Sequence, residues 1–241
     1  MTTFVMTDVT TYVGGYDFTT DLNKVTVKAE VDDLDATTFG GGGYKARLGG
    51  LRDVMADLGG FWQSAISAAV DPQIFSELGT ADRPVTVMPT PTEASVAYMF
   101  LGAKFSYEMF GQVGEITPFS LSMKGTNTYG LVRGQLAKAR GNVSATGAAG
   151  SVLSLGAVGA GQYLYAALHV FSAGTTITVQ VQSDDSGAMS SPTTRGTIGP
   201  VTTAGGTWLV RVAGPITDTF WRLNVSAITG TFNVAGAIGI Q

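Results

Sequence analysis

The sequence predicts an all-β fold with one short helix, arranged as an antiparallel β-barrel or sandwich followed by a small C-terminal β-sandwich. Charged residues make up only 13% of the 241 residues, and glycine occurs 33 times. Short segments in which apolar and polar residues alternate recur along the whole chain. Low charge, frequent glycine and a two-residue period are typical of antiparallel strands joined by tight turns.

The charge distribution divides the chain in two. Eleven of the 14 basic and 15 of the 18 acidic residues precede residue 151. The change falls beside residues 142–150, a run of small residues with the composition of a flexible linker. We therefore predict domains at residues 1–141 and 151–241, joined by a linker at 142–150.

Composition also excludes several classes of protein. No apolar stretch approaches the roughly 20 residues that a spanning helix needs, so we expect no membrane insertion. The N-terminus lacks a basic segment followed by an apolar one, and we expect no secretory signal. The chain has no cysteine, which excludes disulfides and thiolate metal sites. A net charge of −4 argues against tight binding to a nucleic-acid backbone.

The first half begins with a loosely alternating edge segment at 7–18 and then two clear strands. Residues 24–31 place Val25, Val27, Ala29 and Val31 on one face, and residues 53–62 place Val54, Ala56 and Leu58 on one face. Between them, residues 32–52 show no helical pattern and are predicted as a long irregular loop. A compact domain seldom keeps such a loop without a use, and we expect this one to pack on a neighbouring copy.

The remaining elements follow the same reasoning. Asp71, Pro72 and Gly79 are typical of the beginning and end of a helix, with Ile74, Phe75 and Leu78 on its buried face. Further strands are predicted at 83–89, 96–107, 118–124 and 128–138, and alternation places Phe119, Leu121 and Met123 on a buried face.

In the second half, strands are predicted at 162–171 and 176–182 and around Trp208, Trp221 and Phe232, with both tryptophans in the core of a sandwich. Alternation places two further sets of residues on buried faces: Ile177, Val179 and Val181, and Trp221, Leu223 and Val225.

The order of several motifs resembles the tail tube proteins, or major tail proteins, of long-tailed bacteriophages. These motifs are Leu34-Asp35-Ala36-Thr37-Thr38-Phe39-Gly40, a glycine-rich turn, the basic pair Lys45 and Arg47, Gly50-Leu51-Arg52-Asp53, and a strand ending at Gly60-Phe61. The helix that begins at Asp71-Pro72 and the strand at 114–122 are similar to that family too. The resemblance covers residues 5–140. Residues 151–241 are similar to the sandwich domains that some of these proteins carry as outward decoration.

The resemblance implies a non-enzymatic structural protein of the virion tail, made in the host cytoplasm. It implies self-assembly into six-membered rings that stack into a hollow tube. The implied partners are other copies of the chain, a tape-measure protein that fills the tube, double-stranded DNA that passes through it during ejection, and tail completion proteins.

Two sets of residues are candidates for roles in such an assembly. The candidate subunit-interface residues lie in the predicted loop: Phe39, Gly40, Tyr44, Lys45, Arg47 and Leu51. The candidate lumen-facing residues are acidic and would keep DNA mobile by repelling phosphate: Asp32, Asp33, Asp35, Asp53 and Asp57. The alternative for the acidic set is an ordinary solvated surface.

The sequence motifs that would indicate phosphate binding, metal binding or catalysis are incomplete in this chain. The glycines at 40–43 are separated from Lys45 by Tyr44, and no Ser or Thr follows, as a phosphate-binding loop requires. The single histidine, His169, lies in an apolar strand and is predicted to be structural, and Asp184 and Asp185 are predicted to form a solvated turn. We predict no cofactor, no metal and no enzymatic activity. The alternative function is a phage adhesin that binds a receptor or glycan through its C-terminal sandwich.

Overall fold

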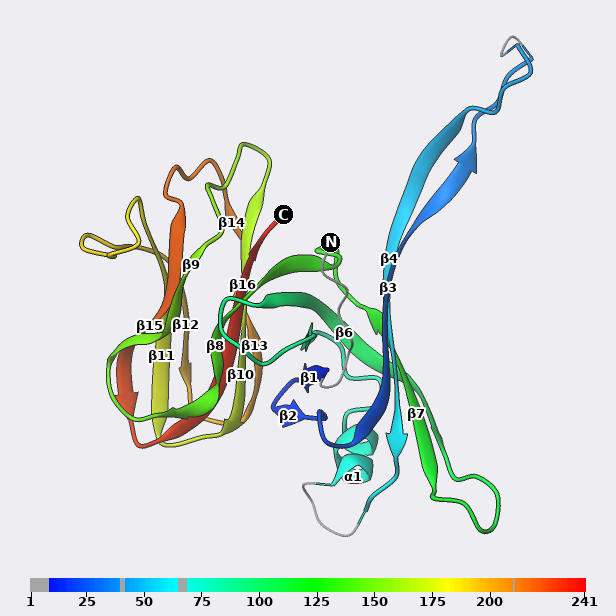
Figure 1. Ribbon diagram of the computed structural model, residues 1–241, viewed down its shortest axis with the longest axis horizontal. Coiled ribbons are helices and arrows are strands. Elements are labelled where there is room, and N and C mark those ends of the chain that lie inside the picture. The colour runs from blue at the N-terminus through cyan, green and yellow to red at the C-terminus, as the bar shows by residue number, and fades with distance from the viewer. Residues whose placement is uncertain (1–8, 40–41, 65–68, 210) are drawn as a thin grey trace.

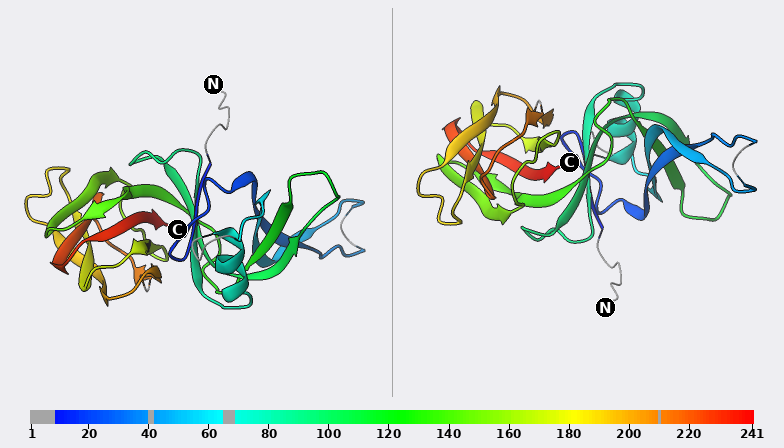
Figure 2. Two further views of the ribbon diagram at one scale, coloured as in Figure 1. Left: turned by 90° about the horizontal axis from the view of Figure 1, so that it is seen from below. Right: turned by 90° about the horizontal axis from the view of Figure 1, so that it is seen from above.

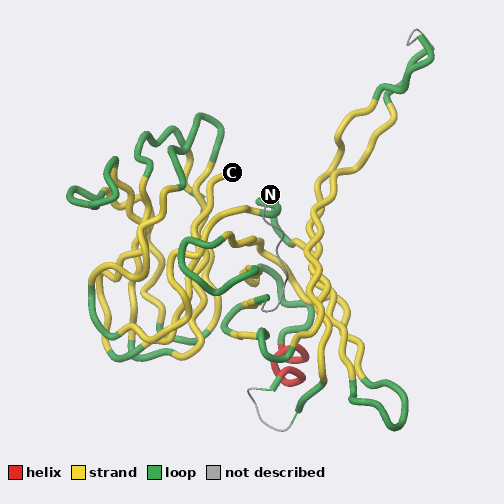
Figure 3. The backbone as a smooth tube through the Cα atoms, in the orientation of Figure 1, coloured by secondary structure: helices red, strands yellow, loops and turns green. Residues whose placement is uncertain are grey.

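A computed structural model describes residues 9–39, 42–64, 69–209 and 211–241. These residues form antiparallel β-sheets with one short helix, which confirms the predicted all-β class (Figures 1 and 3). A β-sandwich lies at one end of the molecule and a long β-hairpin projects at the other, as the two turned views also show (Figure 2). None of the described helices has the length and apolar character needed to cross a membrane.

The first half of the chain supplies eight strands and the helix. Their bounds are β1 (Thr10–Val13), β2 (Tyr16–Asp17), β3 (Leu22–Asp35), β4 (Arg47–Phe61), α1 (Val70–Ser76), β5 (Arg83–Met88), β6 (Val96–Met109), β7 (Pro118–Gly125) and β8 (Val132–Val143).

The second half supplies eight more strands. Their bounds are β9 (Gly147–Ser154), β10 (Tyr163–Ser172), β11 (Thr176–Asp184), β12 (Thr193–Val201), β13 (Gly205–Trp208), β14 (Val212–Ala213), β15 (Phe220–Thr229) and β16 (Phe232–Ile240).

The long strand β6 organises a twelve-stranded sheet. Its first part pairs with β8 and β5, and its second part pairs with β7, which pairs in turn with β4 and then β3. From β8 the sheet continues through β16 and β10 to β13. The hydrogen-bonded path through the described strands ends at β13 and β2 without joining them, so this sheet is open rather than a closed barrel.

A four-stranded sheet, in the order β12-β11-β15-β9, completes the C-terminal sandwich. Its core contains the buried faces predicted for these strands, including Ile177, Val179, Val181, Leu223 and Val225. Trp221 is fully buried among them, and its indole Nε1 donates to the carbonyl oxygen of Gly156 at 2.8 Å. Trp208 differs from the prediction, because it is only half-buried and stacks on Tyr129.

The core of the first half lies between the hairpin sheet and α1. Val54, Ala56 and Leu58 are buried there, as their alternation predicts. The N-cap of the helix is Ala69, two residues before the predicted cap, and Asp71 instead accepts a hydrogen bond from the Tyr107 hydroxyl at 2.9 Å. The predicted buried face of the helix is wrong at Phe75 and at Leu78, which are exposed, while Ile74 is buried. Leu78 also lies beyond the last helical residue, Ser76.

Two predicted connections differ from the structure. Residues 32–52 are not an irregular loop, because β3 continues to Asp35 and β4 begins at Arg47, so most of this segment is a hairpin with paired strands. Residues 142–150 are not a flexible linker, because β8 runs to Val143 and β9 begins at Gly147. Small residues suit this segment because the two strands approach closely here. β16 from the second half then pairs with β8 from the first.

Candidate assembly interface

The most exposed part of the described structure is the outer portion of the β3–β4 hairpin, residues 30–53, which we call the arm. Strand β7 pairs with β4 only from Met55 onward, so the arm has no neighbouring strand on either side. Six residues of β3 lie in the arm, which corresponds to roughly 20 Å at about 3.3 Å per residue. The arm therefore projects as a two-stranded ribbon beyond the body of the protein (Figure 1).

The arm is an ordered hairpin up to its tip, residues 36–46. The Ala36 amide donates to the carbonyl oxygen of Ala46 at 2.9 Å. The hydroxyl oxygen of Thr37 accepts from the Ala46 amide at 3.0 Å, and the Thr37 amide donates to the Asp35 carboxylate at 2.9 Å. These bonds close the neck of the hairpin, which holds the described tip residues, 36–39 and 42–46, clear of the body.

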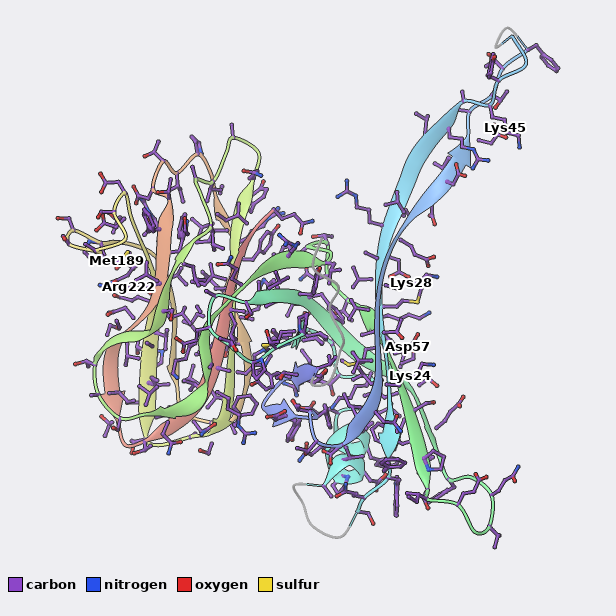
Figure 4. All side chains as sticks on the ribbon, viewed as in Figure 1. Lys24, Lys28, Lys45, Asp57, Met189 and Arg222 are labelled. Carbon is purple, nitrogen blue, oxygen red and sulfur yellow. The ribbon has the colours of Figure 1, made fainter. Side chains whose placement is uncertain are left out.

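The structure places five of the six predicted interface residues on the arm. Phe39 is completely exposed, at 115% of its reference area, and Tyr44 and Leu51 are exposed as well. Lys45 lies in the tip (Figure 4), and Arg47 forms an ion pair with Asp33. Gly40 lies outside the described residues. Large apolar side chains on a two-stranded ribbon have no core of their own to join, and such exposure marks an interaction surface.

The five predicted lumen-facing aspartates do not share one face. Successive residues of a strand point to opposite sides, so Asp33 and Asp35 lie on the face that carries Val31. Asp32 lies on the other face, with Asp53, which pairs with Glu30, and Asp57, which pairs with Thr26. A channel wall formed by one face of these strands can therefore include only Asp32, Asp53 and Asp57.

The face that carries Asp57 is mostly polar across four strands of the body, and Met55 and Phe61 are the apolar residues of β4 on this face. The opposite face of these strands packs on α1 and the core. A shallow groove of about 260 Å³ crosses the polar face, and its polar lining residues are Lys24, Asp57, Ser106, Glu108, Ser120 and Ser122. Figure 4 labels Lys24, Lys28 and Asp57 along the hairpin. Sequence reasoning identified Asp57 in the groove, with Asp32 and Asp53 farther along the same face, but none of the groove residues on β6 and β7, because the partner strands of β4 were unknown.

The four strands of this wall run in the order β3, β4, β7, β6, and each pair is antiparallel. Within the described residues, β3 pairs with β4 only. The end of β6, from Ser106 to Met109, likewise pairs only with β7. Both borders of the wall therefore present unpaired backbone groups, which natural sheets normally cover or pair.

A buried ion pair supports the wall from behind. Lys104 on β6 is fully buried, and its Nζ lies 2.9 Å from the Glu77 carboxylate and 3.0 Å from the carbonyl oxygen of Gln73. Glu77 also pairs with Arg83 at 3.1 Å. Burial lowers the pKa of Lys104 below its ordinary value, and the hydrogen bond to Glu77 opposes that shift. This cluster ties the C-terminal end of α1 to β6.

A second exposed apolar surface was not identified from the sequence. We call it the distal patch: Phe61, Phe110, Val113 and Ile116, at and beside the turn between β6 and β7. The only sequence signal for it is the presence of apolar residues between glycines in a turn, which carries no strand or helix period. The Phe110 ring lies 5.3 Å from that of Trp62, centroid to centroid.

One cavity is lined by residues from both halves of the chain. It holds about 430 Å³ between the base of the arm and the sandwich, and its lining includes Asp53, Tyr129, Tyr163, Tyr165 and Arg211. The guanidinium carbon of Arg211 lies 4.1 Å from the ring centroid of Tyr163 and 5.3 Å from that of Tyr129. Aromatic rings beside charged groups can bind a polar ligand that also has an apolar face.

The histidine and aspartate side chains considered as candidate chemical groups form hydrogen bonds within the protein. His169 is buried, with Nε2 2.8 Å from the Thr86 hydroxyl and Nδ1 2.7 Å from the carbonyl oxygen of Gly14, as a structural histidine requires. Asp184 accepts from the amides of Ser186 and Ser191. It is buried at the end of β11 rather than solvated as predicted, whereas Asp185 is exposed. Over the described residues, no group of three or more His, Asp or Glu side chains could hold a metal ion.

Comparisons with known proteins give matches among solved structures alone. No family model matches the sequence, and no curated protein matches it. A chain from the virion of the native gene transfer agent particle matches 54% of this chain and 97% of its own length, with 16% identity and a TM-score of 0.43. A chain from the tail of the empty gene transfer agent particle, with C6 symmetry, matches 46% and 80%, with 17% identity and a TM-score of 0.37.

The third similar structure is the Dit protein of phage SPP1, described as a hub of the adsorption apparatus in phages that infect Gram-positive bacteria. It matches 97% of this chain and 99% of its own, with 11% identity and a TM-score of 0.39. The chain is thus loosely similar to components of a gene transfer agent particle and of a phage tail.

Proposed function

We propose that this protein is a structural component of a phage tail and that it polymerises as stacked rings into the tail tube. The observation that carries the proposal is the wall of four antiparallel strands with two unpaired borders. Because the number of strands is even, β3 and β6 run in opposite directions. The free border of β3 in one copy can therefore pair in antiparallel fashion with the free end of β6 in the next.

Such pairing is head-to-tail, and repeated head-to-tail contacts close into a ring when the rotation between copies divides a full turn. A closed ring leaves no border strand exposed, which removes the hazard that a long edge strand such as β3 presents. The resemblance of residues 5–140 to tail tube proteins favours six copies. The arm residues Phe39, Tyr44 and Leu51 then serve as apolar contacts with neighbouring copies.

In this ring the polar face forms the channel wall, because the other face is occupied by the core and α1. The charged residues on this face of the wall and the arm are Lys24, Lys28, Glu30, Asp32, Asp53, Asp57, Glu108 and Lys124. Carboxylates outnumber lysines five to three, so the wall repels phosphate weakly and gives double-stranded DNA no site to bind. The tape-measure protein and the tail completion proteins are the other proposed partners.

The C-terminal sandwich is proposed to project from the tube as decoration. Strand β16 of the sandwich pairs with β8, so the sandwich is attached to the body through a shared sheet. The sandwich also has a buried hydrophobic core of its own. The protein acts in the virion tail, without enzymatic activity.

Purified protein tests the proposal directly. Negative-stain images and native mass spectrometry at increasing concentration should show closed rings and tubes. Amide hydrogen exchange should slow on assembly along β3 and along the end of β6, because only assembly pairs those borders. A protein that stays monomeric at every concentration, with unchanged exchange in β3, would exclude the tube function.

The second candidate function is an adhesin that binds glycans. The cavity beside Tyr163 and Arg211 favours it, because aromatic rings and charged groups suit the apolar and hydroxyl faces of a sugar. A glycan array probed with the full chain tests it, with Tyr163→Ala as the variant that should lose binding. An array with no bound glycan excludes this function and does not affect the first.

A further inference from the structure

We propose that the arm tip of one copy docks on the distal patch of a copy in the adjacent ring, so that this contact joins the rings into a tube. The inference rests on the proposed tube function and names the surface that receives the arm.

The two surfaces lie at opposite ends of the same strands. Strand β4 begins at Arg47, beside the tip, and ends at Phe61. Phe61 pairs with Pro118, the first residue of β7, so the turn between β6 and β7 lies at the far end of the wall from the tip (Figure 1). When copies stack along the strand direction in one orientation, the tip of each copy meets the distal patch of the next.

Both surfaces are apolar and unpaired. Among the described tip residues, Phe39 and Tyr44 are exposed aromatic side chains. On the distal patch, Val113 is exposed at 106% and Ile116 at 72% of the reference area. A contact between them would bury apolar surface that neither copy can bury alone.

The charges of the two segments are complementary. Residues 36–46 contain one cation, Lys45, and no carboxylate. Residues 108–118 contain two carboxylates, Glu108 and Glu115, and no cation. Neither Lys45 nor Glu115 has an ion-pair partner among the described residues. Opposite charge selects this end-to-end orientation over tip-to-tip contact, which would bring two lysines together.

The backbone of the distal patch is also unusual. Phe110 has a φ of +74°, a conformation that is rare and strained for a bulky residue. Its amide still donates to the carbonyl oxygen of Pro118 at 3.2 Å, which holds the turn in this conformation. The strain places the phenyl ring against Trp62 at the surface, where it gains little burial in a single copy. Strain that persists without a benefit to the isolated fold points to a functional contact.

Cross-linking tests the contact, because the chain has no cysteine of its own. The double variant Lys45→Cys with Glu115→Cys, treated with a short bismaleimide after assembly, should give a ladder of covalent oligomers longer than dimers. The matched control, Lys45→Cys with Val152→Cys, places the second thiol at an exposed position on the sandwich and should give no ladder. Tubes without a ladder from the first variant would overturn the inference and leave the tube function standing.

Mixing two polymerisation variants gives an independent test. Phe39→Ser removes an apolar side chain from the tip and leaves the distal patch unchanged. Val113→Asp places a charge on the distal patch and leaves the tip unchanged. Each should form rings, with at least a tenfold loss of tubes, and their mixture should give stacks of two rings and no more. The control Val152→Asp should form tubes as the unaltered protein does.

Normal tubes from Val113→Asp would show that the arm docks elsewhere and would overturn the inference. Absence of both rings and tubes in the unaltered protein would overturn the proposed function together with it.

Discussion

The Nδ1 of His169 lies 2.7 Å from the carbonyl oxygen of Gly14, although 155 positions separate the two residues in the chain. His169 lies in β10 of the second half, and Gly14 lies in the turn between β1 and β2 of the first half. Since the ring also contacts the Thr86 hydroxyl of β5, one buried imidazole joins strands from both halves. The two halves are therefore expected to unfold together.

His169→Phe is expected to lower the free energy of unfolding by about 2–4 kcal/mol, because it leaves the Gly14 carbonyl and the Thr86 hydroxyl without partners in a buried site. Urea unfolding followed by tryptophan fluorescence measures the loss, and a single transition would show that both halves unfold together. The exposed substitution Val152→Ala should change stability by less than about 0.5 kcal/mol. An equally small change in His169→Phe would contradict the proposed role of the hydrogen bonds.

Stability is expected to fall in mild acid because burial lowers the pKa of His169 to about 4, against an ordinary value of 6.5. Below pH 6.5 the unfolded chain binds a proton that the folded protein does not bind. The contribution is complete above pH 6.5 and is lost as the pH falls to 4. The loss between pH 7 and 4.5 should be about 2–3 kcal/mol in urea titrations.

His169→Gln separates this effect from the titration of carboxylates. It removes the histidine and leaves the acidic residues, so its stability should depend less on pH over the same range. A variant with the same pH dependence as the unaltered protein would assign the effect to other groups.

The ion pair between Lys104 and Glu77 should respond unequally to the loss of each partner. Glu77→Gln leaves a fully buried ammonium without its carboxylate and should cost about 3–5 kcal/mol. Lys104→Met replaces the ammonium by an apolar chain of similar length, while Glu77 keeps Arg83, and should cost less than about 2 kcal/mol. Thermal unfolding of both variants gives the comparison. Equal losses would mean that burial of the charge does not determine the cost.

Gly150→Ala is expected to be strongly destabilising, because β9 and β8 approach closely there. A Cβ at Gly150 would lie 2.0 Å from the carbonyl oxygen of Ala137, and the residue has a φ of +80°. Gly156 has a φ of +83° with open space around its Cβ position, so Gly156→Ala should cost only about 1 kcal/mol from the backbone conformation. A loss of more than about 3 kcal/mol is expected for Gly150→Ala in urea unfolding. Similar losses in the two variants would exclude close packing as the cause.

Much of the fold could be predicted from local pattern. Alternation identified the buried faces of β4, β7, β11 and β15, because a strand with one face on a core must place apolar residues at every second position. The helix was located by Pro72 and its apolar residues, but its first residue and the exposure of Phe75 depend on what packs beside it. The arm was noticed as a segment without a core, yet its strand pairing was missed, because an exposed hairpin buries neither face.

The candidate interface also has features that the sequence predicts and features that only the structure shows. The sequence by itself determined which residues are exposed apolar groups of the arm, such as Phe39 and Tyr44, since no periodic pattern includes them. Only the tertiary structure decided that Asp33 and Asp35 face away from Asp57, because that depends on the register between β3 and β4. It also decided that β3 and β6 border one wall and that Phe110 lies at its far end. Strand order and register arise from contacts between segments distant in sequence, and local alternation contains no information about them.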